Sequence, residues 1–189
     1  APSLHLAMKH AIKPRRDIGL RTIFNLLGPL TNPAGASRQV LGVYAPELTE
    51  LIARVLLNLG SENAFVVYGM EGIDEISICG ETRITHLEDR RIRTYYLKPE
   101  DLGLKRARKK EIQGGDAARN VEISLSVLRG EKGPCRDVVL LNTAAALVAG
   151  GKVEDLQEGV FQAQESIDKG YALDKLESLR EFSRRSLCS

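Results

Sequence analysis

The stretch that decides the fold is QVLGVYAPELTELIARVLLNLGSENAFVVY, residues 39–68. It opens with a short β-type run at residues 39–44 and closes with an apolar run at residues 64–68. Between these runs, leucine, isoleucine and valine recur at helical spacing from Leu48 onward, until Gly60 supplies a stop. A strand, an amphipathic helix and a strand in succession predict a βαβ unit, in which a right-handed crossover joins two parallel strands.

Closely spaced strand-like runs follow the βαβ unit. They cover residues 75–79, 82–87 and 92–97, and they are separated by Gly80-Glu81 and by Asp89-Arg90-Arg91. Short β-type runs joined by turn residues are typical of hairpins. We therefore expect antiparallel strands to extend the sheet that the βαβ unit begins.

The remainder of the sequence predicts helices. Asp116 is the expected N-cap of an amphipathic helix. The apolar residues of its expected inward face are Ala118, Val121, Leu125 and Leu128. Residues 137–149 are almost all apolar, which indicates a buried helix, and two amphipathic helices are expected at residues 154–169 and from 171 to about 184. The expected class is α/β, one domain with a mixed sheet that has a parallel βαβ core, added antiparallel strands and flanking helices.

Composition excludes several classes of protein. The 189 residues carry 27 basic and 25 acidic side chains, mixed along the sequence, so a net charge of +2 gives no field that favours nucleic acid or an anionic membrane. The one basic run, residues 105–110, lacks the interleaved aromatic residues that stack on bases, which favours a solvated surface. No apolar stretch reaches the roughly 20 residues of a membrane-spanning helix, and the first residues do not resemble a signal peptide. We therefore expect a cytoplasmic location.

The cysteines indicate neither disulfides nor zinc. Cys79, Cys135 and Cys188 are odd in number and widely spaced, without a CxxC motif or a histidine partner. We interpret them as reduced thiols.

Two groups near the start of the sequence could bind a small molecule. Arg15 follows a proline, and its planar guanidinium could hold a carboxylate through paired hydrogen bonds. An arginine in this setting could equally be a solvated surface residue. His5 precedes Met8 by three residues, about one helical turn, so the two could share a face, or His5 could be a structural histidine.

The adjacent carboxylates Asp74 and Glu75 follow Gly72 at the edge of a loop. Hard oxygen ligands of this kind suit Mg²⁺, which takes one or two carboxylates, several waters and substrate phosphates. An exposed acidic turn without any ligand is the alternative, and the dipeptide alone does not decide between the two.

Several motifs occur together and in order along the chain. They are HLAM at residues 5–8, RRDIGLRTIFN at 15–25, GPLTNP at 28–33, GIDEIS at 72–77, GGD at 114–116 and GEKGPCRDVVLLN at 130–142. The ordered set resembles the anthranilate phosphoribosyltransferase family and covers essentially the whole chain. The resemblance implies a fold like that of nucleoside phosphorylases, with a small helical domain and a large α/β domain. Residues 1–189 would form most of the large domain.

The resemblance also implies an activity. The family transfers phosphoribosyl from phosphoribosyl pyrophosphate to the amine of anthranilate, releasing pyrophosphate, in tryptophan biosynthesis, and it uses Mg²⁺ and usually forms homodimers. By position, Arg15 matches the arginine that binds anthranilate, Pro2, His5 and Met8 match the walls of its channel, and Asp74 and Glu75 match the magnesium carboxylates. No general acid or base is assigned, because an aromatic amine needs little activation to attack an oxocarbenium-like centre.

The sequence departs from the family pattern in two ways. The glycine-rich phosphate-binding segment and a later Lys-His-Gly-Asn stretch have no counterpart; we expect both, with the helical domain, to lie before Ala1, and we expect the chain alone to have negligible transferase activity. Tyr68 stands where the family often has histidine. The alternatives are a pyrimidine-nucleoside phosphorylase relative, and a non-catalytic paralogue that binds nucleic acid through residues 105–110.

Overall fold

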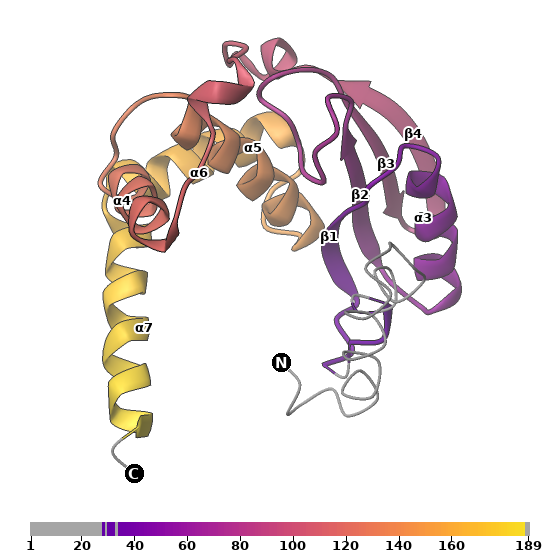
Figure 1. The fold of residues 1–189 in the computed structure, drawn as a ribbon. Coiled ribbons are helices and arrows are strands. Elements are labelled where there is room, and N and C mark those ends of the chain that lie inside the picture. The colour runs from indigo at the N-terminus through magenta and orange to yellow at the C-terminus, as the bar shows by residue number, and fades with distance from the viewer. Residues whose placement is uncertain (1–27, 29, 33, 188–189) are drawn as a thin grey trace, which may run out of the picture.

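A mixed four-stranded sheet organises the chain, with strand order β1-β2-β3-β4. The computed structural model describes residues 28, 30–32 and 34–187. The strands are β1 (Arg38–Gly42), β2 (Asn63–Gly69), β3 (Thr82–Glu88) and β4 (Arg91–Leu97). Helices cover both faces of this sheet (Figure 1), so the expected α/β class is confirmed.

The parallel part of the sheet is the pair β1–β2, which the sequence predicts. The strands pair in parallel with Val40 opposite Phe65, and helix α3 (Leu48–Asn58) connects them. The buried side of α3 carries Ile52, Ala53 and Leu56, which pack in one core cluster with residues from three strands, namely Leu41, Ala64, Val66 and Leu87. The predicted helical period therefore corresponds to the face that meets the sheet.

The antiparallel part of the sheet differs from the expectation at one strand. β2 pairs with β3 and β3 pairs with β4, both antiparallel, and the β3–β4 turn has Asp89 and Arg90 with φ of 48° and 60°, as a type I′ hairpin requires. The strand expected at residues 75–79 is wrong. Both edges of β2 are already occupied by β1 and β3, so this segment forms part of a loop. The isolated bridge between Gly69 and Ile73 lies just before it.

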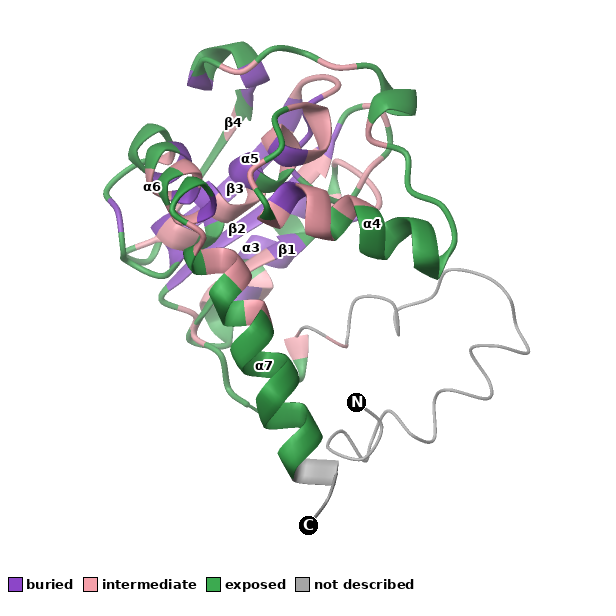
Figure 2. Cartoon of the chain, turned by 90° about the vertical axis from the view of Figure 1, so that its left-hand side faces the viewer, coloured by how far each residue is buried: buried purple, intermediate pink, exposed green. Residues whose placement is uncertain are grey.

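Helices form the layer on the other face of the sheet. After the short helices η1 (Pro99–Leu102) and η2 (Lys109–Glu111), they are α4 (Ala117–Leu128), α5 (Pro134–Ala149), α6 (Leu156–Asp168) and α7 (Tyr171–Leu187). α5 is closest to the sheet, and its Leu141, Ala144 and Ala145 join Phe65 and Ile84 in the main core cluster. Figure 2 shows the buried residues concentrated in the strands and α5, whereas α7 is mostly exposed.

Helix α4 is confirmed as a helix, but its predicted inward face is wrong. Asp116 caps it as expected, because its side chain accepts a hydrogen bond from the Arg119 N–H at 2.8 Å. Val121 is nevertheless 58% exposed, and Val127 is the buried residue of this helix. The helix makes few contacts with α5 and α7, so most of its apolar stripe has no neighbour in the described part of the chain. Among the described residues, no helix combines the length and the apolar character needed to cross a bilayer.

Helices α5 and α6 approach closely because Gly159 has no side chain. A Cβ atom placed on Gly159 would lie 2.8 Å from the Ala144 Cα and 2.9 Å from its Cβ. Both residues are buried. The spacing between the two helices therefore depends on a glycine within a helix, where glycine is otherwise unfavourable.

We expect Gly159→Ala to destabilise the chain by about 1–2 kcal/mol. Alanine gains roughly 0.5–1 kcal/mol in helix propensity, but overpacking a core typically costs about 1–3 kcal/mol. The free energy of unfolding in urea measures the difference. Gln157→Ala, an exposed position in the same helix, is the control and should change stability by less than about 0.5 kcal/mol. A stability equal to or above that of the parent would show that the helices can move apart at little cost.

Candidate functional site

The carboxylates Asp74 and Glu75 lie in the loop that joins β2 to β3. This loop follows Gly69, the last residue of β2, and it covers the carboxyl ends of the parallel strands β1 and β2 (Figure 1). Ligands of open α/β sheets bind at the carboxyl ends of parallel strands. Both side chains are exposed, so they are accessible to a ligand there.

The end of β1 supports the loop directly. A Cβ atom on Gly42 would lie 1.7 Å from the backbone oxygen of Asp74, closer than any two such atoms can approach. Only glycine fits at this position without displacing the loop. The backbone of Asp74 therefore rests on the last residue of β1.

Hydrogen bonds fix the loop on either side of the carboxylates. Before them, the Gly69 N–H donates to the Ile73 oxygen at 2.8 Å. After them, the Ile76 N–H donates to Asn142 Oδ1 at 2.9 Å, and Asn142 Nδ2 donates to the Ile76 oxygen at 2.9 Å. Asp74 and Glu75 thus occupy a short segment that is held at both ends.

Ser77 organises the rest of the loop. It is buried, and its N–H donates to Thr82 Oγ1 at 2.8 Å. Its hydroxyl accepts the Cys79 N–H at 2.9 Å and lies against a carboxylate oxygen of Glu71. The second oxygen of Glu71 is buried and has no hydrogen-bond partner, so a third carboxylate lies in the same loop.

The loop concentrates negative charge that no described residue neutralises. The pKa of Glu75 is raised, first by partial burial and then by the neighbouring carboxylates of Asp74 and Glu71. The ion pair closest in sequence joins Lys98 to Glu81 at 3.9 Å. Within the described residues, none of the three carboxylates has an ion-pair partner, so a bound cation would relieve their repulsion.

These carboxylates fit a Mg²⁺ ion that takes its remaining ligands from water and a substrate phosphate. In the described part of the chain, no group of three or more His, Cys, Asp or Glu side chains is placed to hold a metal ion, which excludes a closed protein cage there. Mg²⁺ needs no such cage, because it retains waters and is completed by substrate phosphates. Two exposed carboxylates beside an unneutralised third suit an ion that arrives with a phosphate ligand.

The other expected site residues lie outside the described residues. They are Pro2, His5, Met8 and Arg15, and their placement stays a prediction.

Tyr68 is half-buried against the core cluster beneath α3. Sequence reasoning missed Asn142, Glu71 and Ser77. Asn142 did leave a signal, because it is one of only two polar residues, with Thr143, inside the apolar run VVLLNTAAALVA.

The basic run at residues 105–110 is partly neutralised. Arg106 pairs with Glu100 at 3.1 Å and Arg108 pairs with Glu111 at 3.0 Å. Both pairs are exposed and contribute little to stability. They also remove two of the charges on which a nucleic-acid surface at this run would depend, so they weigh against the nucleic-acid-binding alternative.

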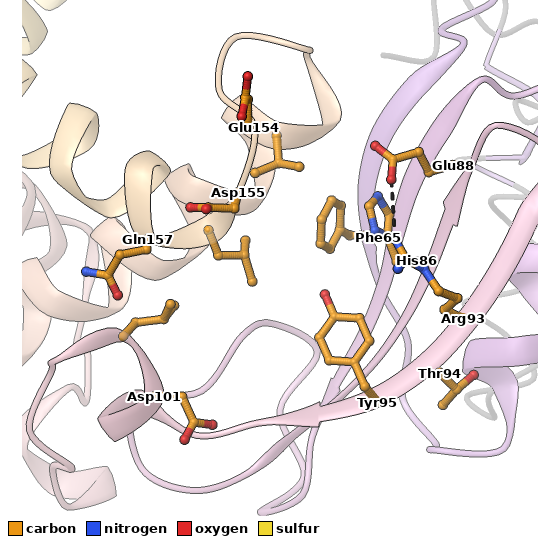
Figure 3. Close-up of a pocket in the computed structure, with 13 residues that line it drawn as sticks. Phe65, His86, Glu88, Arg93, Thr94, Tyr95, Asp101, Glu154, Asp155 and Gln157 are labelled. Atoms are coloured by element: carbon orange, nitrogen blue, oxygen red, sulfur yellow. Dashed lines mark hydrogen bonds and ion pairs between the residues drawn. The ribbon is translucent and has the colours of Figure 1, made fainter.

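A pocket of about 800 Å³ lies elsewhere on the sheet, between β3, β4 and the start of α6 (Figure 3). In it His86 stacks on Phe65 with ring centroids 3.9 Å apart, and burial lowers the pKa of His86. In the sheet register, His86 is opposite Phe65, near the start of β2, whereas Asp74 follows the end of that strand. Asp155, a carboxylate that lines this pocket, is already engaged as the N-cap of α6. Among the described residues that line this pocket, neither Asp74 nor Glu75 occurs.

Comparisons with known proteins agree on one family. The glycosyl transferase family, a/b domain, matches residues 1–173. Anthranilate phosphoribosyltransferases of Symbiobacterium thermophilum and Desulfosudis oleivorans are 56% and 54% identical over 98% and 97% of this chain, which corresponds to 54% and 55% of those proteins. The chain therefore spans about half the length of these curated relatives.

Solved structures give the same result. Anthranilate phosphoribosyltransferase from Thermus thermophilus superposes with a TM-score of 0.88 at 42% identity, over 95% of this chain and 53% of that one. The enzyme from Saccharomyces cerevisiae in complex with phosphoribosyl pyrophosphate and magnesium gives a TM-score of 0.82 at 34% identity, over 94% and 51% of the two chains.

We expect Glu75→Gln to stabilise the folded chain at neutral pH. Folding raises the pKa of the Glu75 carboxyl above its ordinary value of 4.5. The contribution of Glu75 to stability is therefore fully present at a pH below 4.5 and is lost as the pH rises through the raised pKa, where the carboxylate ionises. Unfolding in urea near neutral pH and again well below pH 4.5 measures this. The gain should be present at the higher pH and absent at the lower one. Glu47→Gln, at an exposed carboxylate that directly precedes α3, is the control, and equal curves for the parent and Glu75→Gln at both pH values would contradict the expectation.

Proposed function

The chain belongs to the glycosyl transferase family through its α/β domain, and on that premise we propose that it is the large-domain portion of an anthranilate phosphoribosyltransferase. The observation that carries the proposal is the Asp74–Glu75 pair, held on a fixed loop at the carboxyl ends of parallel strands and lacking any positive partner among the described residues. Relatives that are 50–56% identical to this chain over the aligned residues bear that enzyme name, which supports the same conclusion.

The proposed reaction replaces one bond at C1 of the ribose by another. The bond from C1 to the pyrophosphate oxygen breaks, the amine nitrogen of anthranilate bonds to C1, and the amine loses one proton. Mg²⁺ would neutralise the charge that grows on the departing pyrophosphate. Asp74 and Glu75 would hold the ion at the strand ends, and the fixed loop would keep both carboxylates in place without reorganisation during the reaction.

Arg15 is the proposed partner of the anthranilate carboxylate, with Pro2, His5 and Met8 along the channel that admits the ring. A guanidinium offers two parallel donors to a planar carboxylate. The amine would then be presented to C1 by binding alone, so the proposal assigns no acid or base.

We extend the proposal to the domains, assembly and substrates of the complete enzyme. Residues 1–189 correspond to the large α/β domain, while the small helical domain and most phosphate contacts belong to the part of the family's length that this chain does not span. With the family's usual arrangement, the complete enzyme is a homodimer in the cytoplasm. Phosphoribosyl pyrophosphate and anthranilate are its substrates, and neither nucleic acid nor a membrane is a partner.

We expect Arg15→Ala, made in the protein that contains this chain, to raise the KM for anthranilate by about 10–100-fold. Loss of a charge-assisted pair costs about 1.5–3 kcal/mol, which corresponds to that change in affinity. The KM for phosphoribosyl pyrophosphate should change by less than about two-fold, because the arginine contacts only the acceptor. Steady-state kinetics with each substrate varied measure both constants. Arg16→Ala is the matched control, and equal effects on both substrates would argue against the assigned role.

We expect Asp74→Asn combined with Glu75→Gln to raise the magnesium concentration for half-maximal rate at least about ten-fold, because neutral amides replace both charged ligands. Titration of the rate with Mg²⁺ measures this. Glu154→Gln with Asp155→Asn is the matched control, since it neutralises another adjacent acidic pair and asparagine still caps the helix. An unchanged magnesium requirement in the Asp74–Glu75 variant would refute the metal assignment.

A further inference from the structure

Asn142 of α5 contacts the loop at Ile76, the residue that directly follows Glu75. Its Oδ1 accepts the Ile76 N–H at 2.9 Å, and its Nδ2 donates to the Ile76 oxygen at 2.9 Å and to the Val138 oxygen at 3.0 Å. The first two bonds join residues that are 66 positions apart. One side chain therefore ties the carboxylate loop to the helix layer on the opposite side of the core.

The Asn142 amide replaces a missing strand partner. Ile76 is 1% exposed, yet it belongs to no strand, so its peptide groups have no ladder to pair with. Leaving a buried backbone donor or acceptor unpaired costs about 1–3 kcal/mol. A carboxamide has one donor group and one acceptor group in a plane and can satisfy both peptide groups at once.

The position of this contact matters for the carboxylates. Upstream of them, Gly69 holds Ile73, and Gly42 supports the backbone of Asp74. Downstream, the Ile76 peptide is held by Asn142 through both its N–H and its oxygen. Without Asn142, the peptide that directly follows Glu75 would lose both of these hydrogen bonds, and the next anchored residue would be Ser77.

We propose that Asn142 is a positioning residue for the metal carboxylates, which fixes the backbone that follows Glu75 so that both side chains stay at the metal site. This inference rests on the proposed function, because it takes Asp74 and Glu75 as the magnesium ligands. Asn142 itself touches neither the substrate nor the metal. Partners that orient metal ligands typically change metal affinity about 10–100-fold when they are removed.

The chain contains a matched control for this contact. Asn120 of α4 makes the same pair of bonds to another loop peptide: its Oδ1 accepts the Gly115 N–H at 2.9 Å, and its Nδ2 donates to the Gly115 oxygen at 3.1 Å. That loop lies before α4, not beside the carboxylates. Removing Asn120 therefore removes an equivalent bridge without touching the proposed metal site.

The experiment compares Asn142→Ala, Asn120→Ala and the Asp74→Asn, Glu75→Gln double variant in the protein that contains this chain. Two measurements are made: the Mg²⁺ concentration for half-maximal rate, and Mn²⁺ binding by electron paramagnetic resonance with inorganic pyrophosphate present and no turnover. We expect Asn142→Ala to weaken both about ten-fold. Excess Mg²⁺ should restore most of the rate, and the KM for anthranilate should stay within about two-fold. Asn120→Ala should leave the metal dependence unchanged.

Asn142→Leu is the second variant, for use if Asn142→Ala does not fold. It roughly keeps the size of the side chain and adds no charge, but it can neither accept the Ile76 N–H nor donate to the Ile76 oxygen, so it should also weaken metal binding. A metal dependence that is unchanged in the Asn142 variant that folds, while the double variant loses it, overturns the positioning role and leaves the proposed function intact. Equal shifts from Asn142→Ala and Asn120→Ala also overturn it. No effect of the double variant would instead refute the metal assignment itself.

Discussion

The contact between Gly42 and the backbone of Asp74 is the constraint on which the candidate site depends. It joins the last residue of β1 to the loop that leaves β2, so the two parallel strands and the carboxylates form one unit. Two further anchors, at Ile73 and Ile76, keep the loop on that support. The helices matter to the site chiefly because α5, which packs on the sheet, places Asn142 within hydrogen-bond distance of the Ile76 peptide.

Sequence periodicity predicts those parts of the fold that depend on local pattern. The βαβ unit, the β3–β4 hairpin and the buried α5 all follow from spacing and turn residues. The alternating Ile76 and Ile78 mislead, because both are buried as they would be in a strand, while β2 has no free edge to pair with them. Asp74 and Glu75 could be singled out from their type and position, but their assignment as metal ligands depends on the resemblance to the family. The role of Asn142 could not, because it depends on a contact across 66 residues.

The loop also shows a conflict between stability and binding. Three carboxylates gather where the described residues supply no cation, and the pKa of Glu75 is raised, first by partial burial and then by its two carboxylate neighbours. Such repulsion lowers the stability of the folded chain, and proteins usually retain it only where a ligand benefits. The Ser77 and Asn142 hydrogen bonds stabilise the loop against this repulsion.

Because the strand ends and the loop share one close contact, occupancy of the loop and cohesion of the sheet are thermodynamically linked. A ligand that binds only the folded loop adds its binding free energy to the cost of opening the structure beneath it. Gly42 and Gly69 lie at the ends of β1 and β2 beneath the loop. Next to them, the Val43 N–H donates to the Val67 oxygen at 3.0 Å and so joins the residue after β1 to β2. Slow exchange of the Val43 amide proton with solvent would therefore report on a ligand that never touches it.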